Sequence, residues 1–473
     1  MGADRELCFA SARHLAELMA SGRVSSLEIV RNALARLDAV EPALNTFTHR
    51  DDEGALAAAR AADARRRAGG EAPPLLGIPV SVKDLIEVEG MPCSYGSLTM
   101  RGYVAPADAP SVARLRAAGT IILGKTTTSE FGFRGYTESP VHGVTRNAWD
   151  RARTPGGSSG GAASSVAAGV TPFALATDGG GSIRAPCSLT GLVGIKAQFG
   201  RVPIFPASAT HTLAHVGPIA RDVAYAAMLL HVVAGADERD WTSLQPPLGE
   251  APGAALPLAG LRIAFSPTLG YARVDPEIAG IVAAAVERLR ATWPSIATVE
   301  RVCDEEGEIL SAEFIGGCSA RLGRAVDDTP ELVDPDLCKA ILALRARSAR
   351  DFTDLLRRRL VLRERLREFF TRFDVLLTPT TPAAAWEIGR YVPEFLANAK
   401  VWSFFTYPFN LSGQPAASLN CGYTEIGLPV GLQVVVRAQA EALQLGVLAE
   451  CERLLLGFTP PHELREDVPA RRP

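Results

Sequence analysis

The sequence predicts an α/β fold in which helices cover the faces of a β-sheet. Three short runs, IPVSVKD (78–84), TIILGKT (120–126) and PFALATD (172–178), have the pattern of a buried strand that ends in polar residues. Helical segments such as DAPSVARLRAAG (108–119) lie between these runs. Alternation of strands with helices favours a sheet with helices packed on it.

The first 65 residues are predicted to be helical. The segments RHLAELMASG and SSLEIVRNALARLDAV carry apolar residues at three- and four-residue spacing, which is the period of an amphipathic helix. Ser25 and Ser26 are candidate N-caps of the second helix, with Glu28 close behind them.

The second half of the chain is predicted to leave the sheet and return to it. Residues 236–257 are rich in Pro, Gly, Asp and Ala without periodicity, which indicates a surface connection. LRIAFSP (261–267) restarts a strand, and the stretch 276–372 is mostly helical and strongly charged. DVLLTP (374–379) and LPVGLQVVV (428–436) are expected to return to the same sheet.

These patterns predict one large domain, residues 1–473, with a helical insertion. Its expected parts are an N-terminal helical region (1–65), a core that carries the motifs described below (66–235), the insertion (270–370) and a C-terminal part of the core (371–460). We find neither repeats nor a low-complexity linker that would divide it.

Composition narrows the classes of partner. Lys and Arg number 49 and Asp and Glu number 52, so the formal net charge is −3 and argues against a nucleic-acid or anionic-membrane surface. Hydrophobic residues make up 47% and charged residues 21%, which is enough to bury a sizeable core. The sequence contains no run of 18 apolar residues and does not begin like a signal peptide. We therefore expect a cytoplasmic protein with neither a nucleic-acid nor a membrane partner.

Cysteines and histidines form no metal-binding pattern in the sequence. Eight cysteines are scattered singly without a CxxC pair, and free thiols are the expectation. The seven histidines show no HExxH spacing. His211 and His215 stand four residues apart, but the residues between them offer no third ligand. No metal is expected.

Lysine is rare in this chain. Of the 49 basic residues, 44 are Arg and five are Lys, namely Lys83, Lys125, Lys196, Lys339 and Lys400. Arg does not deprotonate in proteins, whereas a buried Lys can lose its proton near neutral pH. A position that keeps Lys therefore indicates a need for an amine.

Two motifs match nucleotide or hydrolase patterns without the expected context. GTIILGKT, from Gly119, fits GxxxxGK[ST], but its variable residues form strands and not a phosphate-binding turn. GxSxG occurs around Ser158 and Ser159, but the polar segment NAWDRARTP precedes it in place of the strand that a nucleophile elbow needs. GAASSVAAGV after it is predicted to be a small-residue helix.

A second glycine cluster completes a candidate nucleophile site. In TDGGGSIRAP (177–186) a predicted strand ends at Asp178, three glycines follow, and Ser182 comes next. Consecutive glycines let N–H groups converge on an oxyanion. Together with Ser158 and with Lys83 at the end of IPVSVKD, the cluster offers a base, a relay and a nucleophile without a histidine.

These motifs resemble a known family. GIPVSVKD, RTPGGSSGG and TDGGGSIRAP, followed by GLVGIKAQFGRVP, resemble the signature of the amidase signature family of serine hydrolases. Further matches are HVGPIARDVAYAA (215–227), FDVLLTPTTP (373–382) and FTYPFNLSGQPAASLNCGYTEIGLPVGLQVV (405–435). The resemblance covers roughly residues 8–460 and is weakest near 270–370. It implies an α/β fold with a large twisted mixed β-sheet flanked by α-helices on both faces.

The resemblance also implies a catalytic set. Lys83 corresponds to the catalytic lysine, Ser158 to the serine in a cis conformation, and Ser182 to the acyl-accepting nucleophile. Lys83 has to be neutral to accept a proton, so its pKa is expected well below about 10.4. The amides expected to form the oxyanion hole belong to Gly179, Gly180, Gly181 and Ser182.

The expected function is hydrolysis of the carbon–nitrogen bond of a small amide. Ser159, Asp178 and Arg184 are expected to support the site, and no cofactor is implied. Two alternatives within the family are a carbamate (urethane) or urea-type hydrolase and the glutaminase subunit of a tRNA-dependent amidotransferase, which would need partner subunits. A non-catalytic binding protein is disfavoured because the Lys–Ser–Ser set is complete. A homodimer is compatible with the sequence.

The substrate pocket is the least defined part of the prediction. Aromatic residues that could line an apolar acyl pocket are Tyr95, Phe131, Phe133, Trp402 and Phe404. A lone aromatic side chain is more often part of the core than of a binding site.

Overall fold

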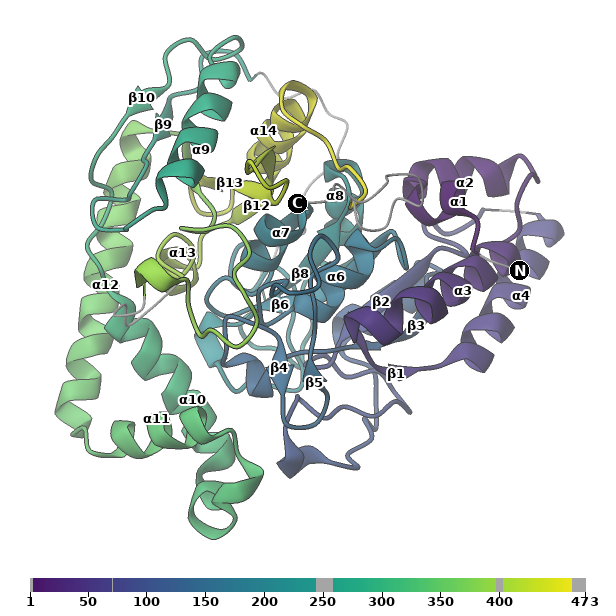
Figure 1. Cartoon of the computed structure of the whole chain (residues 1–473), viewed down its shortest axis with the longest axis horizontal. Coiled ribbons are helices and arrows are strands. Elements are labelled where there is room, and N and C mark those ends of the chain that lie inside the picture. The colour runs from purple at the N-terminus through teal and green to yellow at the C-terminus, as the bar shows by residue number, and fades with distance from the viewer. Residues whose placement is uncertain (1–2, 70, 244–257, 397–402, 462–473) are drawn as a thin grey trace.

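An eleven-stranded mixed β-sheet forms the centre of the computed structural model, which describes residues 3–69, 71–243, 258–396 and 403–461 (Figure 1). Its strands are β1 (Phe47–Arg50), β2 (Pro79–Lys83), β3 (Ile121–Thr126), β6 (Phe173–Asp178), β7 (Val193–Lys196), β8 (His215–Ala220), β9 (Ile263–Phe265), β10 (Ala297–Thr298), β11 (Val375–Pro379), β12 (Ala416–Tyr423) and β13 (Pro429–Val436). Two further strands, β4 (Glu138–Ser139) and β5 (Gly143–Val144), form a separate ladder.

The strand order is β1-β3-β2-β6-β8-β7-β12-β13-β11-β9-β10. The three strands predicted first, β2, β3 and β6, are neighbours and run parallel to one another. β8 is antiparallel to both β6 and β7, and β12 is antiparallel to β7 and β13. The predicted mixed α/β sheet is therefore confirmed.

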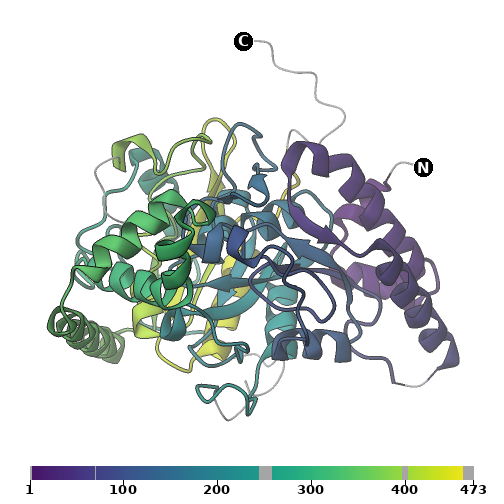
Figure 2. The same cartoon turned by 90° about the horizontal axis from the view of Figure 1, so that it is seen from below.

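Helices cover both faces of this sheet. They are α1 (Arg5–Phe9), α2 (Ala12–Ala20), α3 (Ser26–Leu44), α4 (Asp52–Ala68), α5 (Pro110–Ala117), α6 (Gly160–Ala167), α7 (Arg184–Thr190), α8 (Val223–Val233), α9 (Pro276–Leu289), α10 (Gly307–Asp328), α11 (Pro335–Arg345), α12 (Ala349–Arg372), α13 (Pro408–Ser412) and α14 (Glu441–Leu454). Both views place α1–α4 at one end of the molecule and α10–α12 at the other (Figures 1 and 2).

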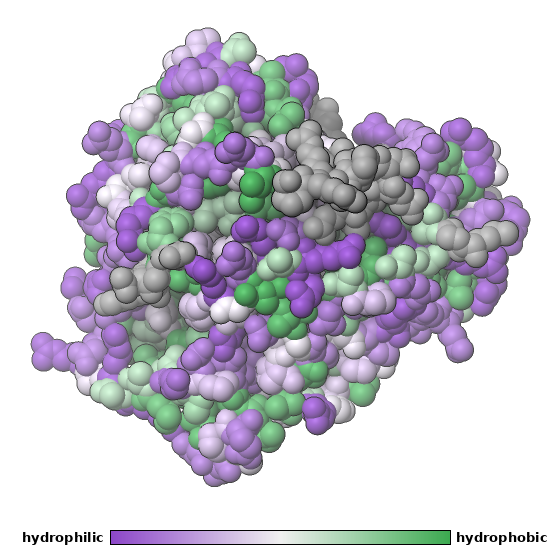
Figure 3. All heavy atoms as spheres, in the orientation of Figure 1, coloured by the Kyte–Doolittle hydropathy of each residue, from purple (hydrophilic) through white to green (hydrophobic). Residues whose placement is uncertain are grey.

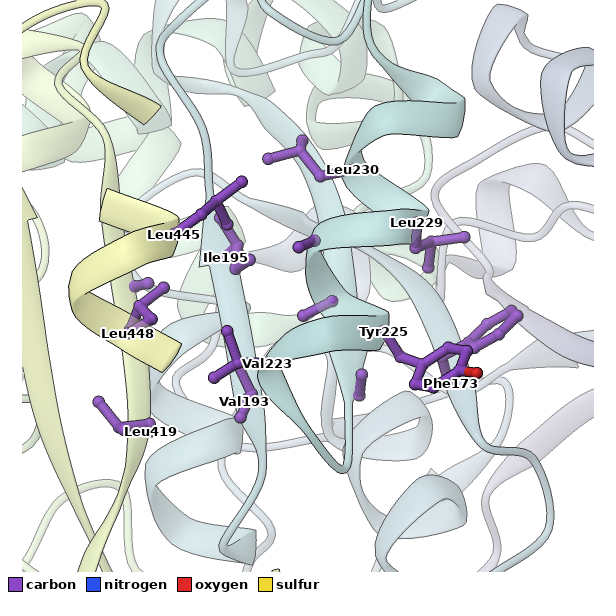
Figure 4. Packing of buried hydrophobic residues seen from close by; sticks show 14 of the residues in the cluster. Phe173, Val193, Ile195, Val223, Tyr225, Leu229, Leu230, Leu419, Leu445 and Leu448 are labelled. Atoms are coloured by element: carbon purple, nitrogen blue, oxygen red, sulfur yellow. The ribbon is translucent and has the colours of Figure 1, made fainter. Parts of the chain in front are cut away.

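The two faces of the sheet bury different sets of side chains because successive strand residues point to opposite sides. In β6, Phe173 and Leu175 join the core under α5, α8, α9 and α14, whereas Ala174 and Ala176 join the core under α3, α4 and α6. Figure 4 shows the first core, where side chains of α8 and α14 pack on Val193 and Ile195 of β7. The small side chains of β6 and α6 allow the helix on the second face to lie close to the sheet.

The N-terminal region differs from its prediction at two points. α2 and α3 form as expected, and Ser25 caps α3 in a capping box with Glu28. Ser26 is not a cap, because it is the buried first residue of the helix. The expectation of helices throughout 1–65 is wrong at β1, which pairs antiparallel with β3. Four residues carry too short a pattern to reveal a strand whose partner lies far along the chain.

The stretch predicted to be helical between 276 and 372 contains α9, α10, α11 and α12. α9 packs on the central sheet, on β11, β12 and β13, whereas α10, α11 and α12 pack largely on one another. Most of the expected surface connection at 236–257 lies outside the described residues.

Hydrophilic residues predominate on the face in Figure 3, where hydrophobic residues gather only in small groups. None of the helices in the described part of the chain combines the length and the apolar character needed to cross a bilayer.

Truncating a central strand should destabilise the fold. Leu175 is fully buried in β6, and Leu175→Ala should lower the free energy of unfolding by about 2–5 kcal/mol through lost burial and a cavity. The measurement is the urea midpoint, followed by circular dichroism. Leu360→Ala on α12 is the control, because Leu360 is 61% exposed and its loss should change the midpoint little. Equal shifts in the two variants would contradict the assigned core.

Candidate active site

The candidate site lies where two parallel strands of the sheet end side by side. Lys83 is the last residue of β2, and Asp178 is the last residue of β6. The register pairs Val82 with Leu175, so the end of β2 lies beside the last residues of β6. The segment before α6 brings Ser158 and Ser159 to the same place.

Lys83 is fully buried and contacts three hydroxyl groups. Its Nζ lies within hydrogen-bond distance of Ser158 Oγ (2.7 Å), Ser159 Oγ (2.8 Å) and Thr177 Oγ1 (2.9 Å). Burial lowers the pKa of Lys83 well below its ordinary value, and the charge of Asp178 opposes this only in part. Burial thus favours the neutral amine over the ammonium form beside these hydroxyl groups.

The hydroxyl of Ser159 has a fixed direction in this cluster. It donates to the carbonyl oxygen of Thr177 at 3.1 Å, so it receives a hydrogen from Lys83. A neutral amine has two hydrogens and one lone pair. In this form the two hydrogens point to Ser159 and Thr177, and the lone pair is left to accept a hydrogen from Ser158. The peptide bond between Gly157 and Ser158 is cis.

The glycine loop after β6 is shaped by its first residue. The Asp178 carboxylate accepts the N–H of Gly181 at 2.7 Å. Within the part of the chain that the structure describes, the N–H groups of Gly179, Gly180 and Ser182 have no partner. The expectation that all four amides are available differs from this arrangement, because the carboxylate already engages Gly181.

Gly181 cannot be replaced without disturbing the loop. Its φ of +133° is disfavoured for residues with a side chain, and a Cβ there would lie 2.3 Å from Thr406 Oγ1. The Thr406 hydroxyl in turn donates to the carbonyl oxygen of Gly180 at 2.7 Å. Asp178 and Thr406 thus hold the loop from two sides.

A buried charge pair lies beneath the loop. Arg184 donates to Asp178 through Nε and Nη2 at 3.0 and 2.9 Å, and both side chains are fully buried. Burial alone would raise the pKa of Asp178, but the charge and hydrogen bonds of Arg184 hold this pKa well below its usual range. Two of the three predicted supporting residues, Asp178 and Arg184, are therefore in contact with each other and Asp178 with the loop, whereas Ser159 contacts Lys83.

The remaining hydrogen bonds of this charge pair come from the C-terminal part of the chain. Arg184 Nη1 donates to the Thr406 carbonyl oxygen at 2.9 Å and to Gln433 Oε1 at 2.8 Å. Asn410 donates to the Asp178 carboxylate at 2.9 Å. The sequence analysis did not assign roles to these three residues, although all of them lie within the motif 405–435. Nothing local marks a residue whose partner is more than 200 positions away.

A pocket joins the candidate catalytic residues to a largely apolar space. Ser158, Thr177, Gly179 and Ser182 line it together. Of the aromatic side chains expected in the pocket, Tyr95 and Phe131 line it, whereas Phe133 and Phe404 lie in neighbouring hydrophobic clusters and Trp402 lies outside the described residues. Lining aromatics that the sequence analysis missed are Phe205 and Phe314.

His215 is a buried structural group. Its Nδ1 lies 2.8 Å from the Leu213 carbonyl oxygen and its Nε2 lies 3.3 Å from Lys196 Nζ. Burial and the nearby Lys196 lower the pKa of His215 well below its ordinary value. His211 is exposed, and a search of the described residues for three clustered metal-ligating side chains finds none.

The sheet order and the Lys–Ser cluster beside a glycine loop define a class of protein, the α/β enzymes with the amidase signature fold. The family model described as "Amidase" matches residues 28–445. This chain therefore belongs to the amidase signature family, whose members cleave carbon–nitrogen bonds.

Curated relatives share this sequence over nearly its whole length. One of them, a glutamyl-tRNA(Gln) amidotransferase subunit from Roseiflexus castenholzii, is 37% identical, and the match covers 98% of each chain. The protein of the same name from Myxococcus xanthus is 37% identical, with 93% of this chain and 96% of that protein covered.

Solved structures share the fold. A bacterial aryl acylamidase of the amidase signature family has a TM-score of 0.86 and 26% identity, with 98% of this chain and 99% of that chain covered. The 6-aminohexanoate cyclic dimer hydrolase in complex with its substrate has a TM-score of 0.84 and 29% identity, with coverage of 97% and 100%. A protein from a study of a vestigial complex and the origins of an s-triazine catabolic enzyme has a TM-score of 0.86 and 28% identity, with coverage of 95% and 100%.

Removing the negative charge beneath the loop should destabilise the protein. Asp178→Asn leaves the buried Arg184 without a counter-charge, which should cost about 3–5 kcal/mol in the free energy of unfolding. The urea midpoint measures the loss. Glu364→Gln is the control, because Glu364 pairs with Arg367 on the surface and its charge should matter little. An Asp178→Asn protein with the wild-type midpoint would contradict the role of the pair.

Proposed function

We propose that this chain hydrolyses the carbon–nitrogen bond of a small carboxamide, with Ser182 as the acyl-accepting nucleophile. The main support is the 2.7 Å hydrogen bond between the buried Lys83 and Ser158, which lines the same pocket as Ser182. A buried lysine of lowered pKa is a base that can take a proton from a serine hydroxyl without a histidine.

In the proposed reaction, Ser182 Oγ attacks the carbonyl carbon of the amide. Its proton passes to Ser158 while the proton of Ser158 passes to Lys83 Nζ. The negative charge that develops on the carbonyl oxygen is stabilised by the N–H groups of Gly179, Gly180 and Ser182.

The second half of the reaction reverses the path of the proton. The carbon–nitrogen bond breaks as a proton returns from Lys83 through Ser158 to the leaving amine, and an acyl ester remains on Ser182. Water then attacks this ester and loses a proton to Lys83 through Ser158. As the acyl–oxygen bond breaks, the proton returns by the same path to Ser182 Oγ, and the acid is released.

A second candidate is the glutamine-hydrolysing subunit of a tRNA-dependent amidotransferase, which acts with partner subunits. The names of the curated relatives favour it over a free-standing amidase. A carbamate or urea-type hydrolase would use the same acyl step. Hydrolysis of simple amides, carbamates and glutamine by the purified chain alone, and again after addition of amidotransferase partner subunits, separates these candidates.

Ser182→Ala should lose amide hydrolysis by several orders of magnitude while the protein stays folded, because no other group in the proposed reaction accepts the acyl chain. The measurements are amide turnover and mass-spectrometric mapping of a fluorophosphonate label. Ser208→Ala is the control, because Ser208 lines the same pocket and has no role in the proposal. A label on Ser158 or Ser159 in place of Ser182 would overturn the assignment.

Lys83→Arg should be nearly as inactive as Lys83→Ala, because a guanidinium does not accept a proton. Wild-type activity should rise with pH through the lowered pKa of Lys83 and level off below pH 10.5, since only the deprotonated amine is a base. Amide turnover from pH 5 to 10 measures both effects. Lys339→Arg, at a lysine whose side chain is 80% exposed, is the control. Near-normal amide turnover in Lys83→Arg would reduce Lys83 to a structural cation.

A further inference from the structure

Helix α10 forms one wall of the candidate active site. Leu310 and Phe314 face the glycine loop, since a Cβ on Gly180 would lie 3.5 Å from Leu310 and a Cβ on Gly179 would lie 3.2 Å from Phe314. Arg321 lines the same pocket. The positions 310, 314 and 321 recur at the spacing of one helical face. This face of α10 therefore extends from the glycine loop to Arg321.

Gly317 holds this wall close to the pocket. A Cβ at Gly317 would lie 1.8 Å from the carbonyl oxygen of Ala209, which is another lining residue. Only a glycine allows the helix to approach so near. The position of Arg321 at the pocket is thus set by backbone packing.

Arg321 carries a charge that the described protein does not neutralise. The charged side chains that line the described pocket are Glu87, Asp178 and Arg321. Asp178 is paired with Arg184, and the buried Glu87 accepts hydrogen bonds from the hydroxyls of Tyr95 and Tyr103 at 2.9 and 2.8 Å. Arg321 is exposed, and among the described residues it has neither an ion pair nor a hydrogen bond.

The guanidinium of Arg321 rests on an aromatic ring at the pocket. Its Cζ lies 6.0 Å from the centroid of Tyr95, a cation–π distance. Stacking of this kind orients the guanidinium while its N–H groups stay available to a ligand. Tyr95 is itself held by Glu87.

The distance between Arg321 and the glycine loop sets the length of a substrate that could contact both. Phe314, which faces Gly179, and Arg321 are seven residues apart, or about 10 Å along the helix axis at 1.5 Å per residue. An arginine side chain can extend over more than half of that distance. Leu85, Ile86 and Phe131 supply apolar surface in the same pocket.

We propose that Arg321 is a specificity-determining residue that binds a carboxylate on the acyl part of the substrate, remote from the scissile bond. A carboxylate matches the planar donor pattern of a guanidinium, and the apolar lining suits a short hydrocarbon spacer. This inference rests on the proposed function. It assigns to the chain a preference for amides of acyl groups that end in a carboxylate.

Two five-carbon amides test the preference. Pentanamide and the monoamide of glutaric acid have the same chain length, and only the second carries a carboxylate. The wild-type protein should show the higher kcat/KM on the glutaric monoamide. Arg321→Gln should reduce that value about 10- to 100-fold, mainly through KM, and leave pentanamide within about twofold, because a hydrogen bond to a charged group is lost. Arg321→Lys should retain part of the preference.

Arg324→Gln is the matched control. Arg324 lies three residues further along α10, is exposed and does not line the pocket. Its loss should leave both substrates unchanged. Equal losses on both amides in Arg321→Gln would overturn the proposal and leave Arg321 as a packing partner of Tyr95.

A binding measurement removes the dependence on turnover. Calorimetric titration of Ser182→Ala with the two amides should give the tighter dissociation constant for the glutaric monoamide. In the double variant with Arg321→Gln, that difference should disappear. Equal affinities in Ser182→Ala would refute the carboxylate site. If pentanamide hydrolysis instead survives in Ser182→Ala, the proposed nucleophile fails, and the binding comparison still decides the role of Arg321.

Discussion

The buried charge pair between Asp178 and Arg184 is the interaction on which the candidate site depends. Asp178 ends a central strand, and its carboxylate holds both the guanidinium and the N–H of Gly181. Arg184 also donates hydrogen bonds to the carbonyl oxygen of Thr406 and to Gln433, which come from the other end of the chain. A buried pair of this kind is costly to assemble and more costly to break on one side. The glycine loop, the sheet and the C-terminal segment are consequently locked together.

Three buried basic side chains in this region, Arg184, Lys83 and Lys196, have different partners. The Arg184 guanidinium faces the Asp178 carboxylate directly, and its charge and hydrogen bonds hold the pKa of Asp178 well below the usual range. Lys83 contacts neutral hydroxyls instead, so burial lowers its pKa. Lys196, also fully buried, has its pKa lowered by burial and by the charge of Arg184.

The pocket is formed by the central sheet with its adjoining segments and by helix α10. The motifs around Lys83, Ser158 and Ser182 lie on the central sheet and the segments next to it. Phe314 and Arg321 come from α10, within the stretch where the family resemblance of the sequence is weakest. The relatives with this fold include an aryl acylamidase and a cyclic dimer hydrolase, whose names indicate different substrates.

The class of fold, the family and the motifs that carry Lys83, Ser158 and Ser182 can be read from the sequence alone. Strand–helix alternation and the glycine and serine motifs are local patterns, so β2, β3, β6, α6 and the neighbourhood of Lys83 could be predicted from them. The three-dimensional structure was needed to show that β1 joins the sheet, that Asp178 binds the N–H of Gly181, and that Arg321 lines the pocket. The first and third of these depend on contacts between segments far apart in the chain. The second depends on the conformation of a turn, which is set by packing and is not encoded in a local sequence pattern. Which partner a side chain meets is decided by packing of the whole molecule.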